Sequence, residues 1–234
     1  MDGIKSIFQG LFRQAPEGHK YFSGSWHGGK AKFYYIPDGE SKVLSGHFEY
    51  VSRFGGSRYI RAKGYFANDL KDGDWTFESR GISTLMTLDT QFSRGVISGS
   101  VEYHREEAAI GFVRQWGLSF RVSDGRVVGS ISGQIDGGKI SGTCDDEGYP
   151  HGEWSLRPGD GDGMVSKEIW DHGALVETYE EHPRKGTKKP KDVGVRRRVN
   201  FALVSDCAKL LSIVGHGSSG RQLYIPSKKA AGDE

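Results

Sequence analysis

The sequence predicts an all-β fold: an elongated, curved antiparallel β-meander of hairpin repeats, with a short N-terminal helix and a short C-terminal helix. Glycine is abundant, at 35 of 234 residues, and lacks the period of collagen. Aromatic residues are also abundant, with 12 Phe, 10 Tyr and 5 Trp, whereas disordered chains are poor in them. Apolar and polar residues alternate over many short runs, which is the period of a strand with one buried face.

Residues 1–18 predict an amphipathic helix. Its apolar positions repeat at helical spacing: Ile4, Ile7, Phe8, Leu11 and Phe12. Pro16 and Gly18 then end the helix. We expect this helix to lie over one end or face of the sheet. The alternative is a helix on a membrane surface, although its polar face is poor in cations.

Residues 19–182 predict the β-hairpin repeat domain, with room for about ten to twelve strands. The alternation is clear where even positions carry large apolar side chains: Ile110, Phe112, Trp116, Leu118, Phe120 and Val122. Asp-Gly pairs at 38–39, 72–73, 124–125 and 136–137 favour primed hairpin turns, because both residues accept positive φ.

Residues 183–199 predict a basic linker, with glycine and proline but few large apolar residues. Eight of the 32 basic residues lie between 184 and 198, against one acid, so the rest of the chain is net acidic. Candidate anion contacts are Arg184, Lys185, Lys188, Lys189, Arg196, Arg197 and Arg198. We expect a solvated linker; contact with anionic lipid is the alternative. Nucleic acid is not an expected partner, because no interleaved aromatic residue offers base stacking.

Residues 200–234 predict a C-terminal helix and tail. Asn200 is the predicted N-cap, and Gly215 the predicted end. Between them, eight apolar residues are expected to form the helix: Phe201, Leu203, Val204, Cys207, Ala208, Leu210, Leu211 and Val214.

A Gly-x-Trp motif occurs three times, as Gly24–Trp26, Gly73–Trp75 and Gly152–Trp154. The segments 70–77 and 149–156 match over eight positions in residue class, and Trp170 with Gly173 forms a variant unit. Looser copies begin at Gly46, Gly64, Gly99, Gly129 and Gly133. The glycine permits a turn or close backbone approach, and the ring two positions on covers the same face. We therefore expect the three indoles to be equivalent packing elements of successive hairpins.

These units resemble the MORN-repeat family, particularly its degenerate bacterial variants. The resemblance is carried by the Gly-x-Trp motifs and by the local matches at 26–30 and 170–173, and it covers about residues 20–180. It implies an elongated, curved antiparallel sheet that binds proteins or lipids. It supplies no catalytic residues.

Other motifs do not predict a reactive site. The glycines of 215–220 lack the βαβ context of a dinucleotide site, and residues 160–163 lack the flanking helices of an EF-hand. The eight histidines show no helical pair, and Cys144 and Cys207 show no ligand or nucleophile signature. We expect no cofactor, no metal and no catalytic residue.

The expected function is a non-enzymatic binding or scaffold module that recognises another protein through a β-repeat surface. Peripheral attachment to an anionic membrane through the basic linker and first helix is one alternative. A hydrolase or ligand-binding β-barrel without a local signature is another. The sequence has no 18-residue apolar run and no signal-like N-terminus, which favours a cytoplasmic location.

Overall fold

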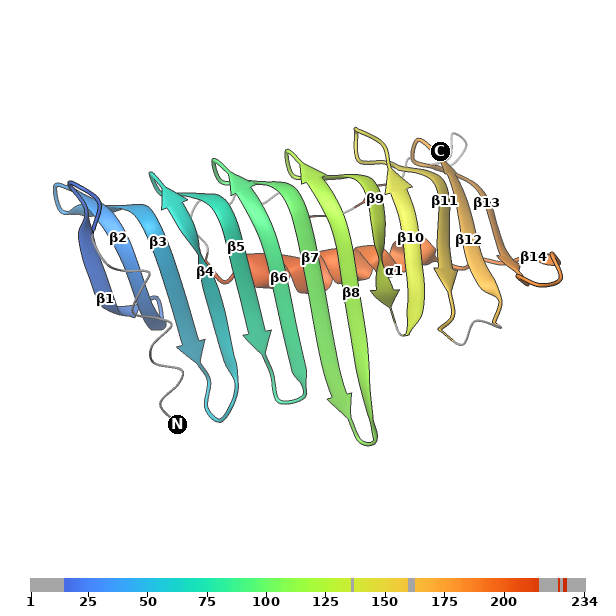
Figure 1. The fold of residues 1–234 in the computed structure, drawn as a ribbon, viewed down its shortest axis with the longest axis horizontal. Coiled ribbons are helices and arrows are strands. Elements are labelled where there is room, and N and C mark those ends of the chain that lie inside the picture. The colour runs from blue at the N-terminus through green and yellow to red at the C-terminus, as the bar shows by residue number, and fades with distance from the viewer. Residues whose placement is uncertain (1–14, 136, 160–162, 215–222, 224, 227–234) are drawn as a thin grey trace, which may run out of the picture.

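The computed structural model describes residues 15–135, 137–159, 163–214, 223 and 225–226, so the predicted N-terminal helix lies largely outside it. The described chain forms one open antiparallel sheet in which every strand pairs with its neighbours in sequence (Figure 1). The strands are β1 (Lys20–Trp26), β2 (Gly29–Asp38), β3 (Ser41–Arg53), β4 (Tyr59–Ala67), β5 (Leu70–Arg80), β6 (Thr84–Ser93), β7 (Val96–Ala109), β8 (Phe112–Ser123), β9 (Arg126–Ile135), β10 (Gly138–Cys144), β11 (Pro150–Arg157), β12 (Val165–Asp171), β13 (Ala174–Glu181) and β14 (Lys188–Pro190). The antiparallel meander is confirmed. The described sheet is not closed into a barrel, because β1 and β14 do not pair.

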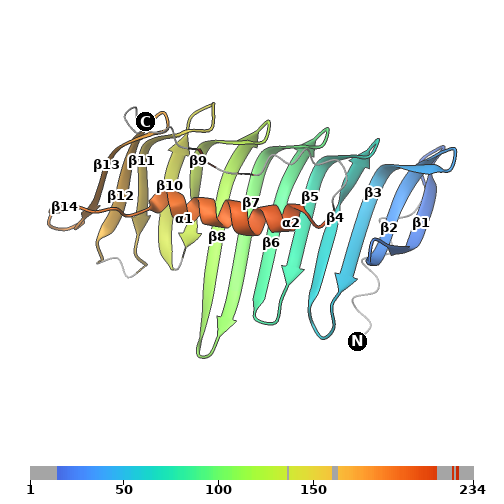
Figure 2. The same ribbon diagram turned by 180° about the vertical axis from the view of Figure 1, so that it is seen from behind.

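A C-terminal helix runs across one face of the sheet, as Figure 2 shows. It comprises α1 (Val195–Phe201), a π-helical segment η1 (Ala202–Cys207) and α2 (Ala208–Leu211), and it contacts β11 and β12 at its start and β5 and β6 at its end. The predicted helix is confirmed, but its predicted start is wrong. Asn200 is not the N-cap: its side-chain amide exchanges two hydrogen bonds with the backbone of Ile225, at 2.8 and 2.7 Å.

The segment predicted as a basic linker is only partly irregular. Lys188–Pro190 forms the edge strand β14, and the helix begins at Val195. The side chain of Arg196 turns inward and donates to the carbonyl oxygen of Ile225 at 2.7 Å.

The two faces of the sheet differ in character. On the face under the helix, directly paired residues form a row across ten strands: Ala31, Tyr50, Ala62, Phe77, Leu88, Tyr103, Leu118, Gly133, Ile140 and Leu156. The side chains in this row are buried, and the helix adds Val195, Val199, Leu203 and Leu210 to the same core. The core therefore lies between helix and sheet.

A regular β-bulge recurs in every second strand from β3 to β11. Each of these strands carries a glycine with positive φ beside a register shift: Gly46, Gly73, Gly99, Gly129 and Gly152. The residue two positions after each glycine is buried: Phe48, Trp75, Val101, Ile131 and Trp154. The repeat unit is therefore a pair of strands with one bulge glycine.

Asp72–Gly73 does not form the predicted turn. Gly73 is a bulge inside β5, and the turn before β5 is at Asn68 and Asp69.

Trp75 and Trp154 occupy equivalent positions, as predicted. The Trp75 indole lies over Gly64 and donates to the carbonyl oxygen of Tyr65 at 3.0 Å. Trp154 lies over Gly142 and donates to the carbonyl oxygen of Thr143 at 2.9 Å. In each case the ring replaces a missing side chain on the neighbouring strand. The predicted equivalence of Trp26 is wrong: this residue ends β1, is half-buried, and packs against Phe33 and Phe48.

Three polar contacts fix the helix to the sheet. At its start, Glu168 of β12 accepts hydrogen bonds from the backbone N–H groups of Val195 and Arg196 at 2.6 and 3.0 Å. In its middle, Asp206 accepts from the Tyr103 hydroxyl and pairs with Arg105 at 3.0 Å. Just past its end, Lys71 donates to the carbonyl oxygen of Val214 at 2.6 Å.

Candidate functional site

The face of the sheet away from the helix carries a continuous row of polar side chains. Direct cross-strand pairing runs from β1 to β12 through Ser23, Lys32, Glu49, Lys63, Thr76, Asp89, Glu102, Ser119, Ser132, Ser141, Ser155 and Lys167. These residues are exposed or half-buried. Because neighbouring strands lie about 4.8 Å apart, the row is an evenly spaced ladder of hydroxyl and charged groups. We call this surface the uncovered face.

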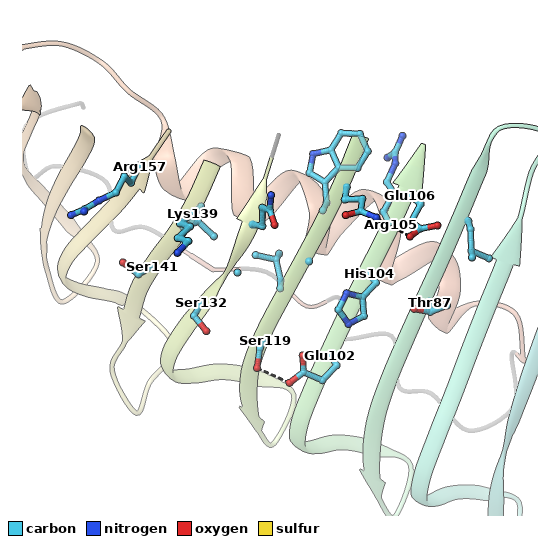
Figure 3. A pocket seen from close by; sticks show the side chains of 18 of the residues that line it. Thr87, Glu102, His104, Arg105, Glu106, Ser119, Ser132, Lys139, Ser141 and Arg157 are labelled. Carbon is cyan, nitrogen blue, oxygen red and sulfur yellow. Dashed lines mark hydrogen bonds between the residues drawn. The ribbon is translucent and has the colours of Figure 1, made fainter. Parts of the chain in front are cut away.

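The central part of the uncovered face is hollowed. A shallow hollow of about 950 Å³ extends over β6 to β11. Figure 3 shows Thr87, Glu102, His104, Ser132 and Lys139 projecting into it from β6, β7, β9 and β10. Neighbouring polar groups are hydrogen bonded: the Ser119 hydroxyl donates to the Glu102 carboxylate at 2.6 Å, and the hydroxyls of Ser141 and Ser155 share a hydrogen bond of 2.9 Å. The hollow is therefore a wide, preorganised polar surface.

Charge is unevenly distributed across this hollow. On the β7 side it presents the carboxylates of Glu102 and Glu106, and on the far side the cations Lys139 and Arg157. Lys139 and Arg157 are direct cross-strand neighbours, and the described residues supply no acidic partner to either. Like charges placed opposite one another destabilise a sheet. An acidic group bound over them would relieve that repulsion.

The reactive groups of the hollow do not form a catalytic arrangement. Ser119 is hydrogen bonded to the carboxylate of Glu102, while the His104 ring packs over Gly117 and makes no hydrogen bond to Ser119. Burial raises the pKa of the Cys144 thiol to about 12, and also raises that of Cys207, so both thiols are inert near neutral pH. A nucleophile with an oriented general base is not present among the described side chains of this surface.

The predicted repeat residues lie mainly in the framework of the sheet. Trp75, Trp154 and Trp170 are buried on the helix side, and Gly73 and Gly152 form bulges. Gly24 lies in β1 without a positive φ, and Gly173 forms the β12–β13 turn. None of these glycine and tryptophan residues lines the hollow.

The predicted anion contacts lie in different settings. Lys188 lies over the Tyr179 ring, Arg196 lies over Trp170, and Arg197 pairs with Asp192. Arg184, Lys185, Lys189 and Arg198 are exposed.

The structure brings together two histidines that the sequence analysis set aside. His151 of β11 and His172 of the β12–β13 turn stack at 4.4 Å between ring centroids, beside Asp171. The Nδ1 atom of His172 is hydrogen bonded to the carboxylate of Asp145 at 2.9 Å. Although desolvation opposes the shift, hydrogen bonds from His172 and from the backbone N–H groups of Tyr149 and Glu147 lower the pKa of Asp145. Spacing along the chain gave no signal, because these residues meet only when β11 and β12 pair.

Within the described part of the chain, none of the helices has the length and apolar character that crossing a bilayer requires. Comparison with known proteins adds no assignment: no family model and no curated protein matches the chain.

Proposed function

We propose that this protein is a non-catalytic binding module that recognises another protein through the hollow of its uncovered face. The observation that carries the proposal is the pair Lys139 and Arg157, exposed as direct neighbours without an acidic partner in the described chain. The MORN-like nature of the array is part of the proposal, and the regular bulge glycines support it.

The chemistry of the hollow defines the partner surface. A partner would place acidic groups over Lys139 and Arg157 and basic groups over Glu102 and Glu106. These two charged sides lie three strand spacings apart, or about 14 Å. That separation exceeds the length of most small ligands and suits the surface of a folded protein. Polar, charge-complementary surfaces give specificity and weaken with added salt.

Site-specific photo-crosslinking tests this function. A photoreactive residue replaces Ser132, between the two charged sides, or Ser205, which is exposed on the helix. We expect one discrete protein adduct in cells from position 132 and none from position 205. In addition, Lys139→Glu with Arg157→Glu should abolish that adduct, whereas Lys209→Glu on the helix should leave it intact. Equal labelling from both positions, or no adduct from position 132, would contradict the proposal.

A second candidate, peripheral membrane attachment, is favoured by a separate observation. Exposed apolar side chains occupy three neighbouring turns at the same end of the strands. These are Phe54 in the β3–β4 turn, Ile82 in the β5–β6 turn, and Ile110 in the β7–β8 turn, beside Phe112 and Val113. Exposed arginines flank them, including Arg58, Arg80 and Arg114. This row of turns, rather than the basic segment 184–198, would enter an anionic bilayer.

Co-sedimentation with vesicles separates the two candidates. Membrane attachment predicts pelleting with phosphatidylserine vesicles that is lost in Ile82→Asp with Ile110→Asp. The photo-crosslink at position 132 should be unchanged by those substitutions.

A further inference from the structure

Four side chains of two neighbouring hairpins converge at one corner of the sheet. Asp145 lies in the β10–β11 loop, His151 in β11, and Asp171 and His172 at the β12–β13 turn. We propose that these residues, the His–Asp cluster, form a site for a divalent transition metal such as Zn²⁺. His151, Asp171 and His172 are the ligands, and Asp145 orients His172.

The ligand atoms are already close to one another. One atom from each of His151, Asp171 and His172 lies within 4.8 Å of the other two. The Asp171 Oδ1 atom is 3.8 Å from Nδ1 of His151 and 4.0 Å from Nε2 of His172. Metal–ligand bonds of about 2.0–2.2 Å require tetrahedral ligand atoms to be about 3.3–3.6 Å apart. All three side chains are exposed, so small rotations close the remaining gap.

The orientation of His172 is the independent indication of a metal ligand. Its Nδ1 atom hydrogen bonds to Oδ2 of Asp145 at 2.9 Å. This contact places the proton on Nδ1 and leaves the lone pair of Nε2 directed at the site. A carboxylate behind the imidazole is the usual outer support of a metal-bound histidine. Asp145 is itself fixed, because its Oδ1 atom accepts from the backbone N–H groups of Glu147 and Tyr149 at 3.0 and 2.9 Å.

The second histidine also presents a lone pair. The Nδ1 atom of His151 accepts a long hydrogen bond of 3.4 Å from the backbone N–H of His172. A metal ion would replace this weak contact with a coordinate bond. Two imidazole nitrogens and one carboxylate suit Zn²⁺ and its neighbours rather than Ca²⁺ or Mg²⁺, which prefer oxygen ligands. Three protein ligands leave one position for water.

A bound ion would join the β10–β11 and β12–β13 hairpins. Because binding to the folded state raises stability, the metal should increase the melting temperature of the protein. This inference is independent of the proposed protein partner, since the cluster is not among the residues that line the hollow.

Calorimetry on tag-free, chelator-treated full-length protein tests the site. We expect one Zn²⁺ per chain, with a higher melting temperature in its presence. The His151→Ala and His172→Asn variants should each weaken binding at least about 10-fold, and Asp145→Asn about 10- to 100-fold. Asparagine tolerates the left-handed backbone of His172, which has a φ of 42°, so that variant keeps the turn.

His27→Asn is the matched control, because His27 occupies the same kind of His-Gly turn, with a φ of 46°. It should bind Zn²⁺ like the wild type. Co²⁺ provides a second readout, with visible absorption bands that the double variant of His151 and His172 lacks. Absence of saturable binding at one ion per chain, or equal binding by the double variant, would overturn the proposal.

Discussion

The Nζ atom of Lys71 donates a 2.6 Å hydrogen bond to the carbonyl oxygen of Val214, 143 residues later in the chain. Lys71 is fully buried and lies two positions before the bulge glycine Gly73. The corresponding residues of the other bulged strands are apolar: Leu44, Ile97, Val127 and Pro150. The repeat that contains β5 therefore has a lysine where the other repeats have an apolar residue, and this lysine binds the chain just after the C-terminal helix.

The buried Lys71 predicts that the free energy of unfolding depends on pH. Burial lowers the pKa of Lys71 from 10.5 to about 8, so between these values the unfolded chain holds a proton that the folded protein has released. The free energy of unfolding therefore rises with pH through this window. Relative to Lys71→Met, the wild type should gain up to about 3 kcal/mol from pH 8 to 10.5. Urea denaturation of both proteins at several pH values measures this difference. If the free energy of unfolding changed with pH in parallel in the two proteins, the prediction would be refuted.

The two buried indoles predict that a side chain at the glycines beneath them lowers the stability of the protein. A Cβ atom at Gly64 would lie 2.1 Å from the Trp75 ring, and one at Gly142 would lie 2.3 Å from Trp154. Gly64→Ala and Gly142→Ala should each reduce the free energy of unfolding by about 1–3 kcal/mol through overpacking. Gly24→Ala is the control, since its Cβ would lie 3.3 Å from Phe22, and it should change thermal stability little. Similar losses in all three variants would contradict this explanation.

Glu168 is predicted to act as the N-terminal cap of the helix, although it belongs to β12. Its carboxylate accepts from two backbone N–H groups and from the Trp170 indole at 3.0 Å, and it is buried. Glu168→Gln removes one acceptor and the negative charge at the helix start, and should cost about 1–3 kcal/mol. Glu153→Gln, at an exposed position of β11, should change stability by less than about 1 kcal/mol in the same denaturation assay.

The buried cluster of Asp206, Tyr103 and Arg105 should control release of the helix. Asp206→Asn removes one of the two carboxylate partners of Arg105, since Glu107 remains at 3.0 Å, and weakens the contact with Tyr103; it should cost about 1–3 kcal/mol. Desolvation and the hydrogen bond to Asp206 raise the pKa of Tyr103, so its hydroxyl stays protonated and can donate to Asp206. Hydrogen exchange across residues 195–211 measures release. Faster exchange is expected in Asp206→Asn but not in Lys209→Ala; no difference between them would exclude this role.

Local periodicity made much of the sheet predictable. Period-two alternation identified β8, and the Asp124–Gly125 turn formed with both φ angles positive, as expected. The match between residues 70–77 and 149–156 correctly identified Trp75 and Trp154 as equivalent. The same local information misplaced Asp72–Gly73 as a turn, because a positive-φ glycine serves equally well in a bulge.

The sequence by itself determined the strand period, the hairpin connections and the apolar stripe of the C-terminal helix, because these depend on residues within a few positions of one another. Only the tertiary structure decided which face the helix covers and that Glu168 begins it. It also decided that Lys139 lies beside Arg157 and His151 beside His172. Each of these relations depends on strand register, and each glycine bulge shifts that register by two residues, which keeps every side chain on its own face. Contacts between distant strands therefore follow from the accumulated pairing of the whole sheet.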